Sequence, residues 1–168
     1  GGYIGTGGVP ATVKNVTIKN SKNLSKSYQH AGMLGGRTTD SVIENVYIEN
    51  CVVEASRYAG FIASCDATPK LSDGTVIKNC VVKGGSVSAT QQVGGIIGMI
   101  EHNSVVENCC VMADVLGEFG IGGILGCVAP SAGTVTIENC WSNCTINADG
   151  KRVGGILGSG NSSVATVS

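Results

Sequence analysis

Cysteine is the residue type with the most chemical potential in this 168-residue chain, which has eight cysteines but only two histidines. A zinc site needs its ligands at short, paired spacings. The nearest approaches are Cys140-x-x-x-Cys144 and the adjacent Cys109-Cys110, and the two histidines are far apart in the sequence. The sequence therefore predicts neither a metal site nor a cofactor. Unpaired thiols would fit a reducing or anaerobic setting.

Carboxylates could instead serve a glycosidase or a lyase, which needs two of them, or one with a base, held close together. The aspartates are scattered over different segments, at Asp40, Asp66, Asp73, Asp114 and Asp149. We therefore predict no catalytic residues and a chain that is not an enzyme. A carbohydrate-active enzyme, or its polysaccharide-binding part, is the alternative hypothesis. The candidate ligand contacts are exposed-looking aromatic and basic residues, Tyr28, Arg57, Tyr58, Lys70 and Arg152.

Two short motifs recur along the chain in the same phase, and they indicate the elements that must position these side chains. Val-Gly-Gly-Ile-Ile-Gly at 93–98 returns at 121–126 and 153–158, with weaker copies at 1–5, 30–35 and 58–63. Between the copies lies Ile/Val-x-Asn-Cys/Ser, whose Asn residues are spaced 30, 29, 29 and 31 residues apart. A repeat of about 30 residues is typical of a solenoid or another repeat architecture.

Each repeat is rich in β-branched residues and turn formers, and none contains a helical pattern. Propeller blades need about 40 residues each, which is more than these repeats offer. The sequence therefore predicts an all-β fold, a right-handed parallel β-solenoid (β-helix) of about five coils with three short strands per coil. Residues 1–168 would form a single domain and a fragment of a longer chain, since they begin Gly1-Gly2-Tyr3 without a Met.

Stacked coils would place equivalent residues in columns. We expect a structural ladder of asparagines, joined by side-chain hydrogen bonds at a coil corner: Asn20, Asn50, Asn79, Asn108 and Asn139. The next position would form an inward column, Ser21 followed by the free thiols of Cys51, Cys80, Cys109 and Cys140. The preceding position would form an outward column of mostly alternating charge: Lys19, Glu49, Lys78, Glu107 and Glu138. The motif glycines would supply permissive φ angles and close approach between coils.

Charge and hydropathy narrow the choice of partners. A formal net charge of −1 argues against binding nucleic acid. No apolar run approaches the roughly 18 to 20 residues needed to insert into a membrane. The open edges of a solenoid could support end-to-end self-association.

The recurring Val-Gly-Gly-Ile-Leu-Gly with intervening Val-x-Asn-Cys resembles the GLUG repeat, and the resemblance covers essentially the whole chain. GLUG repeats occur in large bacterial adhesin-like surface proteins and in non-catalytic regions of M26-type IgA-cleaving proteases. The resemblance implies a secreted or cell-surface location, outside the cell, and a stalk or adhesion module without catalytic residues. A host protein or a glycan would be the partner of such a module.

Overall fold

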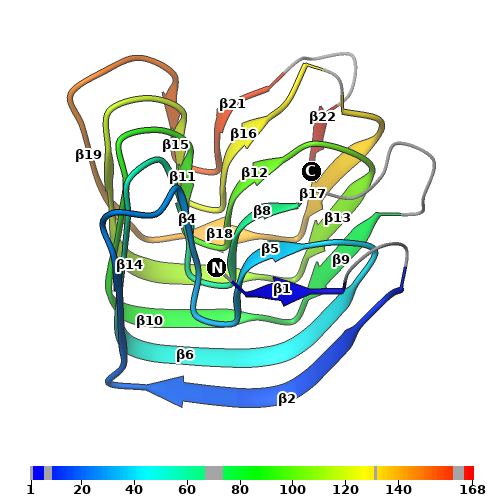
Figure 1. Ribbon diagram of the computed structural model, residues 1–168. Helices are drawn as coiled ribbons and strands as arrows, with labels where there is room; N and C mark the ends of the chain where they lie inside the picture. The colour runs from blue at the N-terminus through cyan, green and yellow to red at the C-terminus, as the bar shows by residue number, and fades with distance from the viewer. Residues whose placement is uncertain (1, 6–8, 67–73, 131, 161–164) are drawn as a thin grey trace.

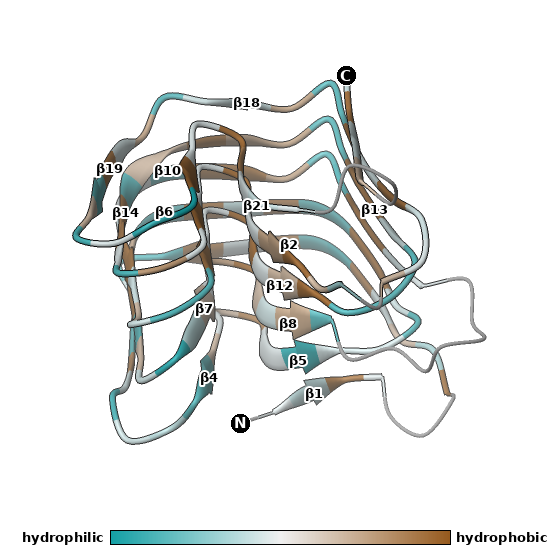
Figure 2. Cartoon of the chain, turned by 90° about the horizontal axis from the view of Figure 1, so that it is seen from above, coloured by the Kyte–Doolittle hydropathy of each residue, from teal (hydrophilic) through white to brown (hydrophobic). Residues whose placement is uncertain are grey.

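The computed structural model describes residues 2–5, 9–66, 74–130, 132–160 and 165–168. These residues form parallel strands, and none of them lies in a helix, so none lies in a helix that could cross a membrane. The strands stack as a β-solenoid of about five turns, which confirms the predicted fold class. With the N-terminal coil nearest the viewer, the chain runs clockwise as it recedes, from β2 through β4 and β5 to β6, so the solenoid is right-handed (Figures 1 and 2).

Three parallel sheets run the length of the solenoid. The six-stranded sheet contains β1 (Tyr3–Ile4), β5 (Gly35–Thr38), β8 (Ala63–Asp66), β12 (Ile97–Ile100), β16 (Leu125–Val128) and β21 (Leu157–Ser159). The five-stranded sheet contains β4 (His30–Ala31), β7 (Tyr58–Gly60), β11 (Val93–Gly94), β15 (Ile121–Gly122) and β20 (Val153–Gly154).

The eleven-stranded sheet is the largest and wraps around a bend in each coil (Figure 1). It contains β2 (Thr12–Lys19), β3 (Lys22–Ser25), β6 (Val42–Ala55), β9 (Thr75–Lys78), β10 (Val81–Ser88), β13 (Ser104–Glu107), β14 (Cys110–Gly117), β17 (Val135–Glu138), β18 (Trp141–Ser142), β19 (Thr145–Ala148) and β22 (Ala165–Val167).

The interior is a stack of apolar columns, because alternate residues of each strand point inward and equivalent residues of successive coils lie side by side. One column in the eleven-stranded sheet runs Val13, Ile43, Ile77, Val106, Ile137 and Val167. Its central members are at most 1% exposed. Apolar residues accordingly line the inner side of the coils in Figure 2.

The register between the second and third coils differs from the one that the Asn spacing predicts. Asn50 and Asn79 are 29 residues apart in the sequence, yet Glu44 pairs with Lys78 and Tyr47 with Val81, an offset of 34 residues (78 − 44 and 81 − 47). Asn79 therefore lies on Asn45 and not on Asn50. We call this offset, five residues longer than the sequence spacing, the register slip.

The predicted Asn ladder is therefore wrong at its second step, and its members belong to two corners. The first corner stacks Asn15, Asn45, Asn79, Asn108 and Asn139. The second stacks Asn20, Asn50 and Gly84. Every one of these residues has a positive φ, between 51° and 58° for the asparagines and 71° for Gly84. The repeated Asn thus makes a left-handed bend, which Asn tolerates better than most residues.

The asparagine side chains are exposed at both corners, so hydrogen bonding within the interior does not explain them. Among the described residues, the side-chain hydrogen bond between stacked corner asparagines joins Asn45 Nδ2 to Asn15 Oδ1 at 3.1 Å. The expected coil-to-coil bond is thus present, but it lies one corner away from Asn20 and Asn50.

The cysteine column divides at the same slip. Cys80, Cys109 and Cys140 stack in one column, whereas Cys51 pairs with Gly85 and lies in the column of Ser21. Each of the four thiols donates to the carbonyl oxygen two residues before it, at 3.2–3.3 Å, and Ser21 Oγ does the same at 3.0 Å. The position after Asn therefore holds a small side chain that can satisfy the carbonyl at the bend.

The glycine motif forms a corner between the five-stranded and six-stranded sheets, and its glycines are needed for a reason other than φ. Gly94, Gly95 and Gly98 are absent from the glycines with positive φ. A Cβ on Gly95 would lie 2.1 Å from the carbonyl oxygen of Gly123 in the next coil. The expectation of permissive φ is thus wrong for these three residues, whereas the expectation of close approach holds.

Candidate functional site

The most varied polar chemistry of the described surface lies where the five-stranded and six-stranded sheets meet. We call this region the cleft and define it by two columns of outward residues. One wall carries Tyr3, Arg37, Cys65, Met99, Cys127 and Ser159 of the six-stranded sheet. The other wall carries His30, Tyr58, Gln92, Gly120 and Arg152, at or beside the five-stranded sheet.

The N-terminal end of the cleft is built around His30. Arg37 Nη2 donates to His30 Nε2 at 2.9 Å, so His30 Nδ1 carries the proton and donates to Ser64 Oγ at 2.9 Å. Ser64 Oγ in turn donates to the carbonyl oxygen of Gly36. Burial, with Arg37 and Arg57 nearby, lowers the pKa of His30 to about 4. His30 is therefore neutral at pH 7.

This histidine–serine contact does not have the arrangement of a catalytic dyad. A general base must accept the proton of the nucleophile, but here the histidine donates to the serine. Ser64 is also 0% exposed, so no substrate reaches its hydroxyl. The contact fixes the ring of His30 and the guanidinium of Arg37 in the wall of the cleft.

Aromatic rings hold the other two arginines. The Arg57 guanidinium lies 4.9 Å from the centre of the Tyr58 ring and donates from Nη2 to Gln91 Oε1 at 2.9 Å. Tyr58 also packs on His30, with ring centres 5.0 Å apart. At the C-terminal end, the Arg152 guanidinium lies 4.8 Å from the centre of the Phe119 ring and reaches Ser159 Oγ at 3.5 Å.

Two hollows open at opposite ends of the cleft. The first, of about 240 Å³, is lined by Tyr3, His30, Gly36 and Arg37. The second, of about 420 Å³, is lined by Cys127, Val128, Pro130, Arg152, Gly158, Ser159 and Gly160. Between them the walls approach, because Gln92 and Cys127 lie close around Gly120.

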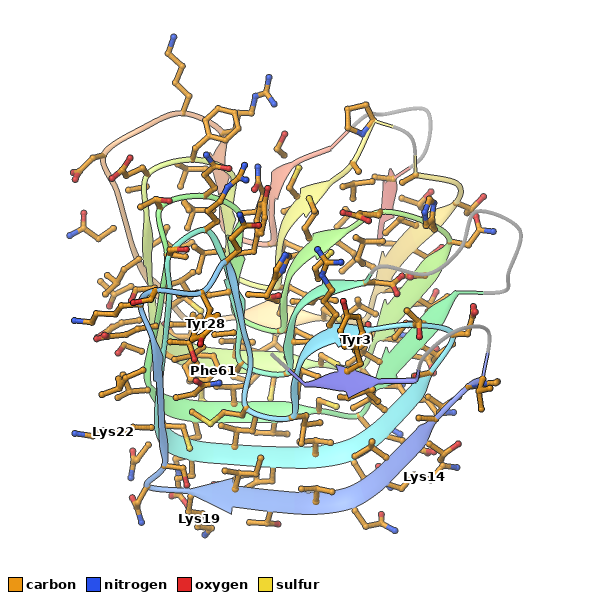
Figure 3. The ribbon with its side chains drawn as sticks, in the orientation of Figure 1. Tyr3, Lys14, Lys19, Lys22, Tyr28 and Phe61 are labelled. Carbon is orange, nitrogen blue, oxygen red and sulfur yellow. The ribbon has the colours of Figure 1, made fainter. Side chains whose placement is uncertain are left out.

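The ligand contacts predicted from sequence fall partly in this region. Arg57, Tyr58 and Arg152 lie along the cleft. Tyr28 is 66% exposed and its carbonyl accepts from Ser56 N, so it lies on the adjoining turn between the coils (Figure 3). Lys70 lies outside the described residues.

Sequence reasoning missed His30, Arg37 and Phe119. One available signal is that all three arginines of the chain, Arg37, Arg57 and Arg152, lie next to a copy of the glycine motif. Their convergence could not be read from spacing, because the coil register determines which residues face one another.

A second polar cluster is buried at the corner between the six-stranded and eleven-stranded sheets. Asp66 is 0% exposed and accepts hydrogen bonds from Thr75 Oγ1 at 3.0 Å and from Ser104 Oγ at 2.6 Å. Thr38 Oγ1 lies 3.4 Å from the same carboxylate. These hydroxyls compensate a buried charge, as P-type solvation by water would do on the surface. A carboxylate without solvent access cannot act on a polymer, so this cluster is structural.

The thiols form no metal centre among the described residues, where no group of three potential ligands is suitably placed. All eight cysteines are free. Cys140 and Cys80, stacked on either side of Cys109, together with burial raise the pKa of the Cys109 thiol. Burial and Glu101 likewise raise the pKa of the Cys65 thiol. These two thiols are therefore protonated and poorly nucleophilic at pH 7.

The eleven-stranded sheet carries a different charge pattern from the cleft. Its outer face pairs Lys19 with Glu49 at 2.7 Å and Lys14 with Glu44 at 3.0 Å. Lys78 lies 3.9 Å from Glu44, so the predicted stacking of Lys78 on Glu49 is wrong and follows the register slip. Glu107 and Glu138 do stack as like charges.

Comparisons with known proteins give one similarity. The chain is 29% identical over 162 residues to halomucin of Haloquadratum walsbyi (strain DSM 16790 / HBSQ001), a match that covers 88% of this chain and 2% of halomucin. The chain thus spans only a very small part of that relative. No family model matches the chain, and no solved structure matches it.

Proposed function

We propose that this chain is a non-catalytic structural and adhesive module, a rigid segment of a much longer secreted or cell-surface protein. The observation that carries the proposal is the unbroken parallel stacking from β1 to β22, whose core is apolar and whose buried polar groups are used in hydrogen bonds within the fold. Such stacking gives a straight, stiff element in which each coil contacts only its neighbours.

Two further lines support this proposal. The similarity to halomucin matches this chain to 2% of a far larger protein, as expected for one module among many. The resemblance of the glycine and asparagine motifs to GLUG repeats favours an adhesin-like bacterial surface protein.

The location can be tested on cells that produce the parent protein. An antibody raised against the 168-residue chain is expected to label intact cells, and brief treatment with an external protease should remove the label. Labelling only after the cells are lysed would contradict a surface location. A cytoplasmic protein of the same cells, stained in parallel, controls for leakage.

The absence of catalysis is tested separately on the purified chain. Incubation with neutral and acidic polysaccharides should leave their size distribution unchanged on gel filtration. Release of shorter chains, abolished by a substitution in the cleft, would favour the alternative of a carbohydrate-active enzyme.

A further inference from the structure

The arginines and the lysines of this chain are placed differently. All ion pairs found among the described residues use lysine, and they lie on the first three coils of the eleven-stranded sheet or beside it. All three arginines lie on the opposite side, along the cleft, and none is within ion-pair distance of a described carboxylate. Their charge is therefore available to a ligand.

The guanidinium groups are also held in place before any ligand arrives. Rings of Tyr58 and Phe119 support Arg57 and Arg152, and His30 accepts from Arg37. A pre-positioned arginine loses less conformational entropy on binding than a free one, and its planar fork matches the oxygens of carboxylates and sulfates.

The backbone at Arg152 is unusual in the same sense. Its φ is +68°, and the residue stacked beneath it in the preceding coil is Gly120, with a φ of +69°. A side chain other than Gly or Asn in this region costs about 1 to 2 kcal/mol. The chain nevertheless places an arginine here, at the rim of the larger hollow.

The spacing along the solenoid axis favours an extended ligand. The step from Arg37 to Cys127, one in each hollow, is three strand spacings, about 14 Å. A small anion could occupy one hollow only, whereas a polymer with repeated acidic groups could reach both.

We propose that the cleft binds an acidic polysaccharide, laid along the solenoid axis, whose carboxylate or sulfate groups bind Arg37 and Arg57 at one end and Arg152 at the other. This inference rests on the proposed adhesive role and gives it a ligand class. Glu101, which influences the thiol of Cys65 between the two hollows, would face the middle of the bound chain.

Other polymers fit the cleft less well. The strands run across the cleft and their backbone groups are used between coils, so a peptide could not add to a strand edge along its length. Nucleic acid is disfavoured by a formal net charge of −1 and by the pairing of the lysines with glutamates elsewhere.

Binding is tested by biolayer interferometry on the whole chain, with heparin as the sulfated probe, alginate as the carboxylated probe and dextran as the neutral one. We expect heparin or alginate to bind, dextran not to bind, and affinity to fall steeply with salt. The variant Arg57→Gln/Arg152→Gln should weaken binding by about tenfold or more, because it removes two charged contacts.

The matched control is Lys14→Gln/Lys22→Gln, which removes the same charge from the opposite side and should leave binding within about twofold. An equal loss in both variants would overturn the proposal in favour of non-specific attraction. Poly-glutamate binding as tightly as the polysaccharides would assign the cleft to acidic peptides instead.

A measurement on the unmodified chain removes any dependence on variant folding. Bound heparin or alginate should protect Arg37, Arg57 and Arg152 from phenylglyoxal, as read by mass spectrometry. Absence of both binding and protection would overturn the polysaccharide site. It would leave the surface location untouched, because the antibody experiment tests that separately.

Discussion

Asparagine at the bends carries more of this fold than its exposure suggests. Asn15, Asn45, Asn79, Asn108 and Asn139 all have φ near +55°, with printed values from 51° to 58°. Glycine is the other residue that adopts this backbone region easily, and Gly84 takes the equivalent place on Asn50. The residue is therefore selected for its backbone, with the side chain left to solvent.

Substitution at one bend tests this account. Asn79→Ala should lower the free energy of unfolding by about 1 to 2 kcal/mol, because alanine resists the left-handed region. Asn79→Gly should lower it by less, and Lys78→Ala by about 0.5 kcal/mol or less, because its ion-pair distance is long. Urea unfolding followed by circular dichroism measures all three. Equal losses for Ala and Gly would show that the side chain matters instead.

The thiol after the bend has a defined partner. Cys109 Sγ donates to Glu107 O at 3.2 Å, and the side chain is 1% exposed. Cys109→Ala should cost about 1 to 3 kcal/mol, because it leaves a buried carbonyl with one partner fewer and removes a buried sulfur. Cys109→Ser should cost less, since Ser21 makes the same bond in the first coil. The order of the two unfolding midpoints decides the point.

His30 gives the chain a pH dependence. Its pKa is lowered to about 4 by burial and by Arg37 and Arg57, whereas it is about 6.5 in an unfolded chain. Between these values the unfolded chain binds a proton that the folded chain does not. The free energy of unfolding should therefore fall as the pH falls from about 6.5 to about 4. Melting temperatures of the wild type and of His30→Gln over this range should differ in slope. Parallel slopes would contradict the assignment.

At the scale of the element, the glycine corner is set by the distance between coils. A Cβ on Gly123 would lie 2.1 Å from Gly155 O and 2.5 Å from Ser142 Oγ, whereas a Cβ on Gly155, at the same motif position, meets nothing within 4 Å. The two glycines are equivalent in sequence and differ in what is stacked on them.

This pair supplies its own control. Gly123→Ala should lower the free energy of unfolding by about 1 to 3 kcal/mol, because the backbone of the neighbouring coil must move. Gly155→Ala should change it by about 0.5 kcal/mol or less. Thermal unfolding of the two variants side by side measures the difference. A comparable loss in both would show that φ, and not crowding, selects glycine at this corner.

The elements also show where prediction from sequence succeeds and fails. The coil period and the all-β class follow from the spacing of the glycine and asparagine motifs, since only stacked coils use such spacing. The register slip could not be predicted, because β2 and β6 each contain the pattern twice, as Ile43-Glu44-Asn45 and Ile48-Glu49-Asn50 do. A spacing of 29 matched the second copy, but packing chose the first.

The same limit applies to the cleft. Arg57, Tyr58 and Arg152 were identifiable as aromatic and basic residues near turns. His30 and Arg37 were not, because their partnership depends on two sheets meeting across a corner. Local chemistry could be read from the residues, whereas neighbours across sheets could not.

For the whole molecule, the register slip means that a repeat in the sequence is not always a coil in space. Deleting residues 80–108 joins two equivalent bends, Asn79 and Asn108, and removes one complete coil. Deleting 51–79, which has the same length, joins unlike corners. The first variant should fold with reduced stability, as expected for a solenoid that loses one neighbour contact.

The second deletion variant should fail to give a cooperative transition, because its inward residues would move to wrong positions in the stack. Deleting 46–79 instead removes the coil that the observed register defines, and it should restore folding. Circular dichroism and thermal unfolding distinguish the three variants. A folded 51–79 deletion would contradict the observed register.

The direction of the interstrand hydrogen bonds has a mechanical consequence. In every sheet these bonds point along the solenoid axis, so a pull on the two ends loads one layer of bonds after another, in series. All the bonds between two neighbouring coils share the load at each layer. An outer coil has a neighbour on one side only within the described chain, and it should peel away first. Stretching would then give a staircase of small rupture forces, one per coil, instead of a single large event.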